Sequence, residues 1–165
     1  MPTPPEEGFP MFEMTPTEVE EFLRTPRHAV LATNRTDGAP QLSPVWFLYE
    51  GGLLYVGTER GSAKHRNLMR DDRISLCIVA GHPDARAVMV HGRAEILEAD
   101  SPGVEDIRWR VTRLYKGSDE EARRYREMRG DVDSVMLRIT AERIISHDFN
   151  NRLEVLEEAE RDTAG

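Results

Sequence analysis

The stretch Leu53–Asn67, LLYVGTERGSAKHRN, passes from an apolar strand through a glycine-containing turn into a helix that begins near Ser62. The first N–H groups of a helix have no partner inside the helix, and the positive end of its dipole lies there. Five side chains add positive charge or hydrogen-bonding groups around this helix start: Arg60, Ser62, Lys64, Arg66 and Asn67. The stretch predicts a site for an anion such as a phosphate. A capped surface helix with solvated charges is the alternative.

The charge balance of the chain limits the kind of partner it can bind. The net charge is −8, from 30 acidic and 22 basic residues. This balance argues against general binding to nucleic acid or to an anionic membrane, which would require a basic face. An anionic ligand therefore has to be held by a local pocket. Only two of the basic residues are lysines, Lys64 and Lys116, so a lysine inside the predicted anion site is unusual for this chain.

The apolar segments and the single cysteine indicate the cellular compartment. No apolar run approaches the ~20 residues of a membrane span. The proline-rich, acidic start MPTPPEEGFP lacks the features of a signal peptide. We therefore expect a cytoplasmic protein. Cys77 excludes a disulfide framework within the chain, and its position in the run ISLCIV predicts a small buried side chain.

Composition divides the chain into three parts. Residues 1–13 are predicted to be a flexible N-terminal arm, residues 14–149 a folded domain, and residues 150–165 a charged tail with a helix over 153–161. Within the domain, Thr15-Pro16-Thr17-Glu18 has the cap, proline and glutamate that start a helix. Further helices are expected over 63–70 and, as one or two helices, within 101–129.

The domain is expected to be mainly β, of the α+β class, with six antiparallel strands. Short turns between the first three strands predict a meander. A nearly continuous apolar run predicts that the fourth is buried on both faces, and Gly92 predicts a bulge in the fifth. A curved sheet of this kind closes into a barrel, with a two-sheet sandwich as the alternative. The expected strands are His28–Asn34, Gln41–Glu50, Leu53–Thr58, Arg73–Ala80, Arg86–Glu98 and Asp133–Phe149.

A second candidate binding segment is Ser43-Pro44-Val45-Trp46. A proline cannot donate to a β-ladder, so Pro44 belongs at a sheet edge, at a bulge, or where a ligand replaces the neighbouring strand. Ser43 and the backbone near Val45 could bond the edge of a flat heterocycle, and Trp46 could form a wall of the same cavity. The alternative is that Trp46 belongs to the core and Pro44 marks an edge strand.

The histidines and carboxylates predict neither a metal site nor hydrolytic chemistry. The five histidines are scattered without the spacing of zinc ligands. There is no Ser/His/Asp set and no nucleophile elbow. The many carboxylates lie mainly in charged helical segments, where solvated faces explain them. We therefore assign no catalytic side chain from the sequence.

Three stretches together resemble the pyridoxamine 5'-phosphate oxidase-like, FMN-binding split β-barrel family, and most closely its actinobacterial branch that uses the deazaflavin coenzyme F420. They are HAVLATNRTDGAPQLSPVWF at 28–47, TERGSAKHRNLMRDDRISL at 58–76 and VHGRAEIL at 90–97. The ending RIISHDF at 143–149 is also similar. The segment Ser-Ala-Lys-His-Arg-Asn around Lys64 differs from the phosphate motif of true pyridoxamine-phosphate oxidases, which argues against vitamin synthesis.

The resemblance implies a six-stranded split barrel with peripheral helices, assembled as a homodimer with two cofactor sites at the subunit interface. The phosphate of the cofactor would lie on Ser62, Lys64 and Asn67. The ring system would lie along Ser43–Trp46 and Thr58. These positions agree with the two segments singled out from the residues themselves.

The resulting leading hypothesis is an oxidoreductase that transfers a hydride between reduced coenzyme F420 and a small organic acceptor. An FMN-dependent oxidoreductase on the same scaffold is the first alternative. The second alternative is a protein that binds F420, haem or another tetrapyrrole without turnover. A haem would require an axial ligand, for which His28 and His91 are the candidates.

Overall fold

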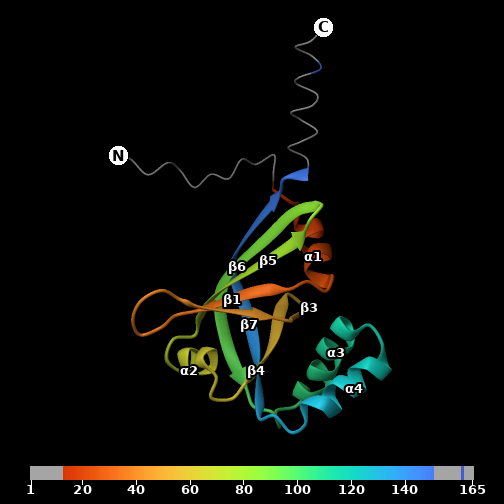
Figure 1. Cartoon of the computed structure of the whole chain (residues 1–165). Helices are drawn as coiled ribbons and strands as arrows, with labels where there is room; N and C mark the ends of the chain where they lie inside the picture. The colour runs from red at the N-terminus through yellow and green to blue at the C-terminus, as the bar shows by residue number, and fades with distance from the viewer. Residues whose placement is uncertain (1–12, 151–160, 162–165) are drawn as a thin grey trace.

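The computed structural model describes residues 13–150 and 161, and its strands form one antiparallel sheet in the order β2-β1-β5-β6-β7-β4-β3 (Figure 1). Nearly all of the predicted N-terminal arm and charged tail, including residues 153–160 of the predicted helix over 153–161, lies outside the described residues. The seven strands are β1 (Ala29–Thr33), β2 (Gln41–Val45), β3 (Leu48–Glu50), β4 (Leu53–Glu59), β5 (Arg73–Gly81), β6 (Asp84–Leu97) and β7 (Ser134–Asp148).

The sheet is curled into a split barrel. Strands β2 and β3 stand at opposite ends of the strand order, yet only Trp46 and Phe47 separate them in the chain. Three peptide units span at most roughly 11 Å, so the two edges of the sheet must approach each other. The class and the barrel are as the sequence predicts, with seven strands in place of six.

One predicted strand, Gln41–Glu50, is in fact two strands. Its first half pairs with β1 and its second half with β4, so the predicted three-stranded meander is wrong. The chain changes edges at Trp46, whose ring stacks on Tyr115 with centroids 5.0 Å apart. The next residue, Phe47, is buried, and its N–H donates to the Tyr115 hydroxyl at 3.1 Å. These contacts with a distant helix end the first ladder.

The bend of the barrel lies in the two long strands β6 and β7. Their register shifts between His91 and Gly92, which confirms the predicted bulge. A Cβ atom at Gly92 would lie 2.1 Å from the carbonyl oxygen of Thr140. Only a residue without a side chain allows the two backbones to approach so closely.

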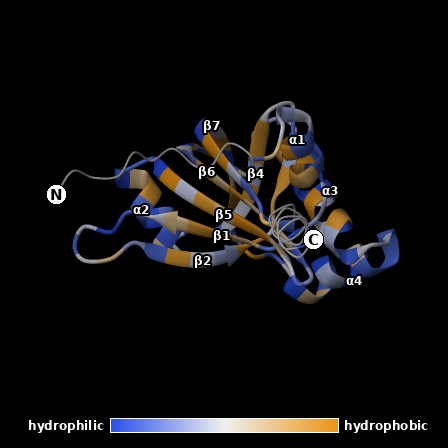
Figure 2. Ribbon diagram, turned by 90° about the horizontal axis from the view of Figure 1, so that it is seen from above, coloured by the Kyte–Doolittle hydropathy of each residue, from blue (hydrophilic) through white to orange (hydrophobic). Residues whose placement is uncertain are grey.

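The core fills the inside of the barrel, and part of the outer face is apolar as well. Strand β5 alternates between buried and exposed residues, so the prediction that it is buried on both faces is wrong. Cys77 is exposed, contrary to prediction, and pairs in register with Val30 of β1. Figure 2 shows hydrophobic residues along β1, β2 and β5. A continuous apolar run arises here because both faces of the strand carry apolar residues.

The described residues 13–150 contain four helices: α1 (Pro16–Arg24), α2 (Ala63–Arg70), α3 (Val104–Lys116) and α4 (Asp119–Arg129). The first three pack against the sheet, and α4 packs mainly against α3. Helix α1 begins with the predicted cap, since Thr15 and Glu18 form a capping box. The segment after β6 folds into two helices, because Gly117 ends α3 in a left-handed conformation and Ser118 caps α4. No helix in the described part of the chain is long and apolar enough to cross a membrane.

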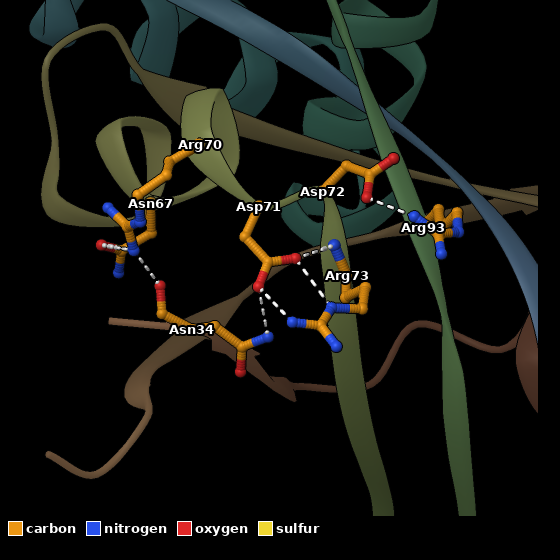
Figure 3. A network of polar contacts seen from close by, with 7 residues as sticks. All are labelled: Asn34, Asn67, Arg70, Asp71, Asp72, Arg73 and Arg93. Carbon is orange, nitrogen blue, oxygen red and sulfur yellow. Dashed lines mark hydrogen bonds and ion pairs between the residues drawn. The ribbon is translucent and has the colours of Figure 1, made fainter. Parts of the chain in front are cut away.

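Helix α2 has the predicted bounds and is fixed at its C-terminal end by a polar network (Figure 3). Asp71 accepts hydrogen bonds from Arg73 Nη2 at 2.7 Å and from Asn34 Nδ2 at 3.0 Å. Arg70 Nη2 donates to the backbone oxygen of Asn34 at 2.6 Å. The bonds from Arg73 and Asn34 hold the pKa of Asp71 well below its usual range. The network ties α2 to the ends of β1 and β5.

We expect Gly92→Ala to lower the free energy of unfolding by about 3 kcal/mol or more, because the new methyl group would force β6 away from β7. Gly57→Ala is the matched control, since a Cβ atom there meets nothing within 4 Å. Chemical denaturation of the two variants measures the difference. Equal stabilities would show that the approach of β6 to β7 does not require glycine.

We expect Asp71→Asn to destabilise the protein at neutral pH and much less in acid. A carboxylate with a lowered folded pKa contributes stability above its unfolded pKa, about 3.9, and this contribution is lost as the pH falls through the folded value. The difference in the free energy of unfolding between wild type and variant should therefore be constant above about pH 5 and become smaller below it. Denaturant unfolding across pH 2.5–7 measures it, with Asp37→Asn as the exposed control. A gap independent of pH would contradict the role of the network.

Candidate functional site

A cleft of about 930 Å³ lies where the barrel is split. One wall is the end of β2 with the residue that follows it, and the other is the end of β4. Beyond Tyr55, β4 pairs only with β7, so its second edge carries no strand there. Helices α3 and α4 close the side of the cleft. The cleft contains six of the eight predicted site residues: Pro44, Val45, Trp46, Thr58, Ser62 and Lys64.

The start of α2 forms one end of the cleft. Ser62 caps the helix by accepting a hydrogen bond from the N–H of His65 at 3.3 Å. Its hydroxyl lies 3.2 Å from that of Thr58, the last but one residue of β4. The N–H groups of Ala63 and Lys64 donate to no acceptor among residues 13–150 and 161. Two unpaired amides and two hydroxyls thus gather at one point.

Lys64 is the cation that belongs to this end of the cleft. Its side chain is half-buried, and burial lowers the pKa of its ammonium group, while the charge of Glu59 acts in the opposite direction. Lys64 forms no ion pair with any described residue. The cleft has four other cations, and each has a carboxylate partner: Arg108, Arg123, Arg126 and Arg129. Lys64 is therefore the charge available to an anion.

Arg60 and Arg66, which the sequence places near the same site, are used elsewhere. The guanidinium of Arg60 binds the carboxylates of Glu98 and of Asp133, the latter at 2.9 Å. Arg66 donates from its guanidinium to the backbone oxygen of Gly61. Neither arginine lines the cleft. The positive charge expected from Arg60 is cancelled by its two carboxylate partners.

Two predicted site residues, Asn67 and Ser43, lie outside the lining of the cleft. Asn67 is buried, and its Nδ2 donates to Thr33 Oγ1 at 3.1 Å, which joins α2 to β1. Ser43 pairs in register with Leu31, a residue of the core, and is half-buried. In contrast, its neighbour Pro44 lies on β2 at the end of the sheet, so the prediction of an edge position is confirmed.

The aromatic wall of the cleft involves more residues than the sequence predicts. Trp46 stacks on Tyr115 and lies 5.4 Å from Tyr125, centroid to centroid, and its Nε1 donates to His28 Nε2 at 3.2 Å. The ammonium of Lys116 lies 4.3 Å from the Tyr125 ring centroid. The sequence signal was weak, because α4 reads DEEARRYREMR and resembles a solvated helix. The stack fixes Trp46 against α3 and α4.

Of the two histidines considered as haem ligands, one lines the cleft and the other does not. His28 lines the cleft, but its Nε2 accepts the hydrogen bond from Trp46. His91 is exposed on β6, and its Nδ1 lies 2.9 Å from the hydroxyl of Ser75. Within residues 13–150 and 161, no three or more His, Cys, Asp or Glu side chains are placed to hold a metal ion.

Solved structures share this architecture. The conserved hypothetical protein Rv2991 from Mycobacterium tuberculosis is 30% identical, with a TM-score of 0.70 over 83% of this chain and 86% of that one. An F420 reductase is 23% identical, with a TM-score of 0.58 over 76% and 94% of the two chains. The heme storage protein HutZ from Vibrio cholerae is 18% identical, with a TM-score of 0.60 over 78% and 92%. The last two show a common fold alone.

The sequence itself matches a known family over most of its length. No curated protein matches the chain. The family model described as pyridoxamine 5'-phosphate oxidase matches residues 15–148, from the cap of α1 to the end of β7. This range includes the whole sheet and all the residues that line the cleft. The chain therefore belongs to the pyridoxamine 5'-phosphate oxidase family.

Proposed function

We propose that the cleft binds the deazaflavin coenzyme F420 and that the protein is an oxidoreductase acting on a small organic acceptor. The observation that carries the proposal is the half-buried, unpaired ammonium of Lys64 beside the free amides of α2. A buried charge without a partner is costly. An anionic group of a ligand would supply the missing partner. In a protein of net charge −8, such a site indicates a specific anionic ligand.

The cleft suits a phosphorylated ring system in size and in chemistry. Pockets for cofactors usually have volumes of roughly 300–1,000 Å³ and combine apolar walls with a few polar groups, and this one has about 930 Å³. The polar end offers Thr58, Ser62 and Lys64 to a phosphate. Pro44, Val45 and Trp46 offer apolar and aromatic surface to a ring.

In this proposal the residues of the chain bind and orient the ligand. Lys64 and the first amides of α2 hold its phosphate, and the Thr58–Ser62 pair donates or accepts hydrogen bonds beside it. Trp46, fixed by its stack on Tyr115, keeps the wall of the ring pocket in one position and excludes water. When bound, the deazaflavin would supply the hydride chemistry itself. No side chain is assigned as a catalytic acid. Asn67 acts through the position of α2.

Two alternatives use the same scaffold. An FMN-dependent oxidoreductase would also place a phosphate on Lys64. A haem-binding protein without turnover has a solved neighbour of the same fold in the heme storage protein HutZ. Nothing in the described residues favours haem, because His28 Nε2 is already bonded to Trp46 and His91 lies on the sheet outside the cleft. Titration with F420, FMN and haem, followed by absorbance, separates the three.

We also propose that a second copy of the chain covers the outer face of the barrel. Three apolar side chains of this face are exposed: Leu42 on β2 is 61% exposed, Val30 on β1 40% and Val79 on β5 55%. By register they share one face with the exposed Cys77. Contiguous exposed apolar surface marks an interface. Pro44 lies in the same row as Val30, so this interface would adjoin the cleft.

We expect Lys64→Ala to weaken F420 binding about 10- to 100-fold with little change in stability, because a hydrogen bond to a charged group contributes about 1.5–3 kcal/mol. Fluorescence titration measures the affinity. Arg24→Ala, which removes a charge from the exposed face of α1, is the control. Unchanged affinity in Lys64→Ala would contradict the proposal that the phosphate binds at this end of the cleft.

The same site should show a characteristic pH dependence. Burial lowers the pKa of Lys64, so the ammonium loses its charge at a pH below the ordinary lysine value as the pH rises. The F420 affinity of the wild type should therefore start to fall before the pH reaches the ordinary lysine value of about 10.4, while Lys64→Arg, which stays charged, should lose less. Parallel curves for the two proteins would contradict the assignment of Lys64.

We expect Val79→Asp to convert a dimer into monomers, because the new carboxylate would be buried without a partner in the interface. Light scattering with size-exclusion chromatography measures the mass. Met128→Asp, at an exposed position on α4, is the control. A monomeric wild type, or a dimer that survives Val79→Asp, would contradict the proposed interface.

A further inference from the structure

We propose that Glu59 determines which kind of phosphate the cleft accepts. It neutralises Arg129, so that the phosphate end of the cleft presents a single available positive charge, that of Lys64. Such a site suits the singly charged phosphodiester of F420 and disfavours the doubly charged phosphomonoester of FMN. This inference rests on the proposed binding of a phosphorylated cofactor at Lys64.

Glu59 is built into the same turn as the phosphate end. It is the last residue of β4, and its backbone oxygen accepts a hydrogen bond from the N–H of Ser62 at 3.2 Å. Its side chain lines the cleft, where Oε1 lies 2.7 Å from Arg129 Nη2 on α4. Glu59 thus contacts the start of α2 through its backbone and α4 through its carboxylate.

The ion pair with Arg129 is open to solvent. The side chains of Glu59 and Arg129 are 60% and 39% exposed. An exposed pair is weak and is screened by salt, so the effect of Glu59 on phosphate affinity should be small and should decrease with added salt. Glu59 makes no ion pair with Lys64, yet its charge favours the ammonium form of that lysine. The carboxylate therefore acts on both cations.

The remaining arginines of the cleft do not replace Arg129. Arg108 and Arg126 both contact Glu105, at 3.3 Å and 2.5 Å. Arg123 lies 3.9 Å from Asp119. Within the described chain, each of these cations already faces a carboxylate, whereas Lys64 does not.

The two candidate cofactors differ in the charge of the group that would lie here. The phosphate of F420 is a diester and carries one negative charge. A phosphomonoester such as that of FMN has a second pKa near 6 and carries about two charges at neutral pH. A dianion would leave one charge uncompensated and would be repelled by Glu59. A monoanion is matched by Lys64 alone.

The experiment measures how much each phosphate contributes to binding. Dissociation constants at pH 7.5 are compared for FMN against riboflavin, and for F420 against its phosphate-free deazaflavin alcohol. The ratio for FMN and riboflavin is the contribution of the phosphate, and the ratio for the F420 pair is the contribution of its whole phosphodiester tail. The proteins are the wild type, Glu59→Gln and Glu127→Gln. Glu127 also lines the cleft but has no cation partner among the described residues, so its variant removes the same charge from another place.

We expect Glu59→Gln to raise the phosphate contribution for FMN about fivefold, the scale of an exposed ion pair. In the same variant, the contribution for F420 should change less than that for FMN. In Glu127→Gln, the contributions for FMN and for F420 should each change less than they do in Glu59→Gln. The double variant Glu59→Gln with Arg129→Gln restores the original charge and should return FMN to the wild-type value. Thermal unfolding of each variant checks that the fold is retained.

Two results would overturn the inference. One is an unchanged ratio of the dissociation constants of riboflavin and FMN in Glu59→Gln. The other is a gain in this ratio that persists in the double variant, because Glu59 would then not act by neutralising Arg129. Both leave the proposed function intact if F420 still binds the wild type through Lys64. Failure of the wild type to bind F420 at all would instead contradict the proposed function.

Discussion

The two-residue link Trp46–Phe47 is the constraint on which the rest of the structure depends. It joins strands at opposite ends of the sheet, so the sheet has to curl until its two edges meet. Tyr115 holds the link, because its hydroxyl donates to the oxygen of Arg27 at 2.6 Å and accepts from the N–H of Phe47. The edges meet without pairing beyond Tyr55 of β4, and the space left between them is the cleft. The fold and the candidate site thus have one cause.

Local signals in the sequence were sufficient for the parts of the site that depend on one helix. The bounds of α2, its Ser62 cap and the position of Lys64 follow from capping and spacing, which act over a few residues. The division of Gln41–Glu50 into β2 and β3 could not be predicted in this way. It depends on Tyr115, almost 70 residues further along the chain, and no pattern within the segment itself records that contact.

The error about Cys77 and the missed contribution of α4 to the cleft have a related origin. An apolar run such as ISLCIV indicates two apolar faces but does not show what covers each of them. It therefore predicts a fully buried strand even where one face is exposed. The charged sequence of α4 indicates that the helix is exposed, but it does not indicate which other elements the helix lies beside. Arg123, Arg126 and Arg129 reach the cleft only because Gly117 turns α4 back along α3 and towards β4. Hydrophobic periodicity reports the burial of a face and not its neighbour.

The use of lysine at position 64 follows from the abundance of carboxylates and arginines around it. Arginine presents a planar fork that binds a carboxylate at two points, whereas lysine is a compact point charge on a flexible stem. Arg60 shows the consequence at the same turn, since it is bound by both Glu98 and Asp133. An arginine at position 64 would have the carboxylate of Glu59 nearby and could form an ion pair with it, as Arg60 does with Glu98 and Asp133. Lysine avoids that capture, and in a chain with 30 acidic residues this keeps one cation available in the cleft.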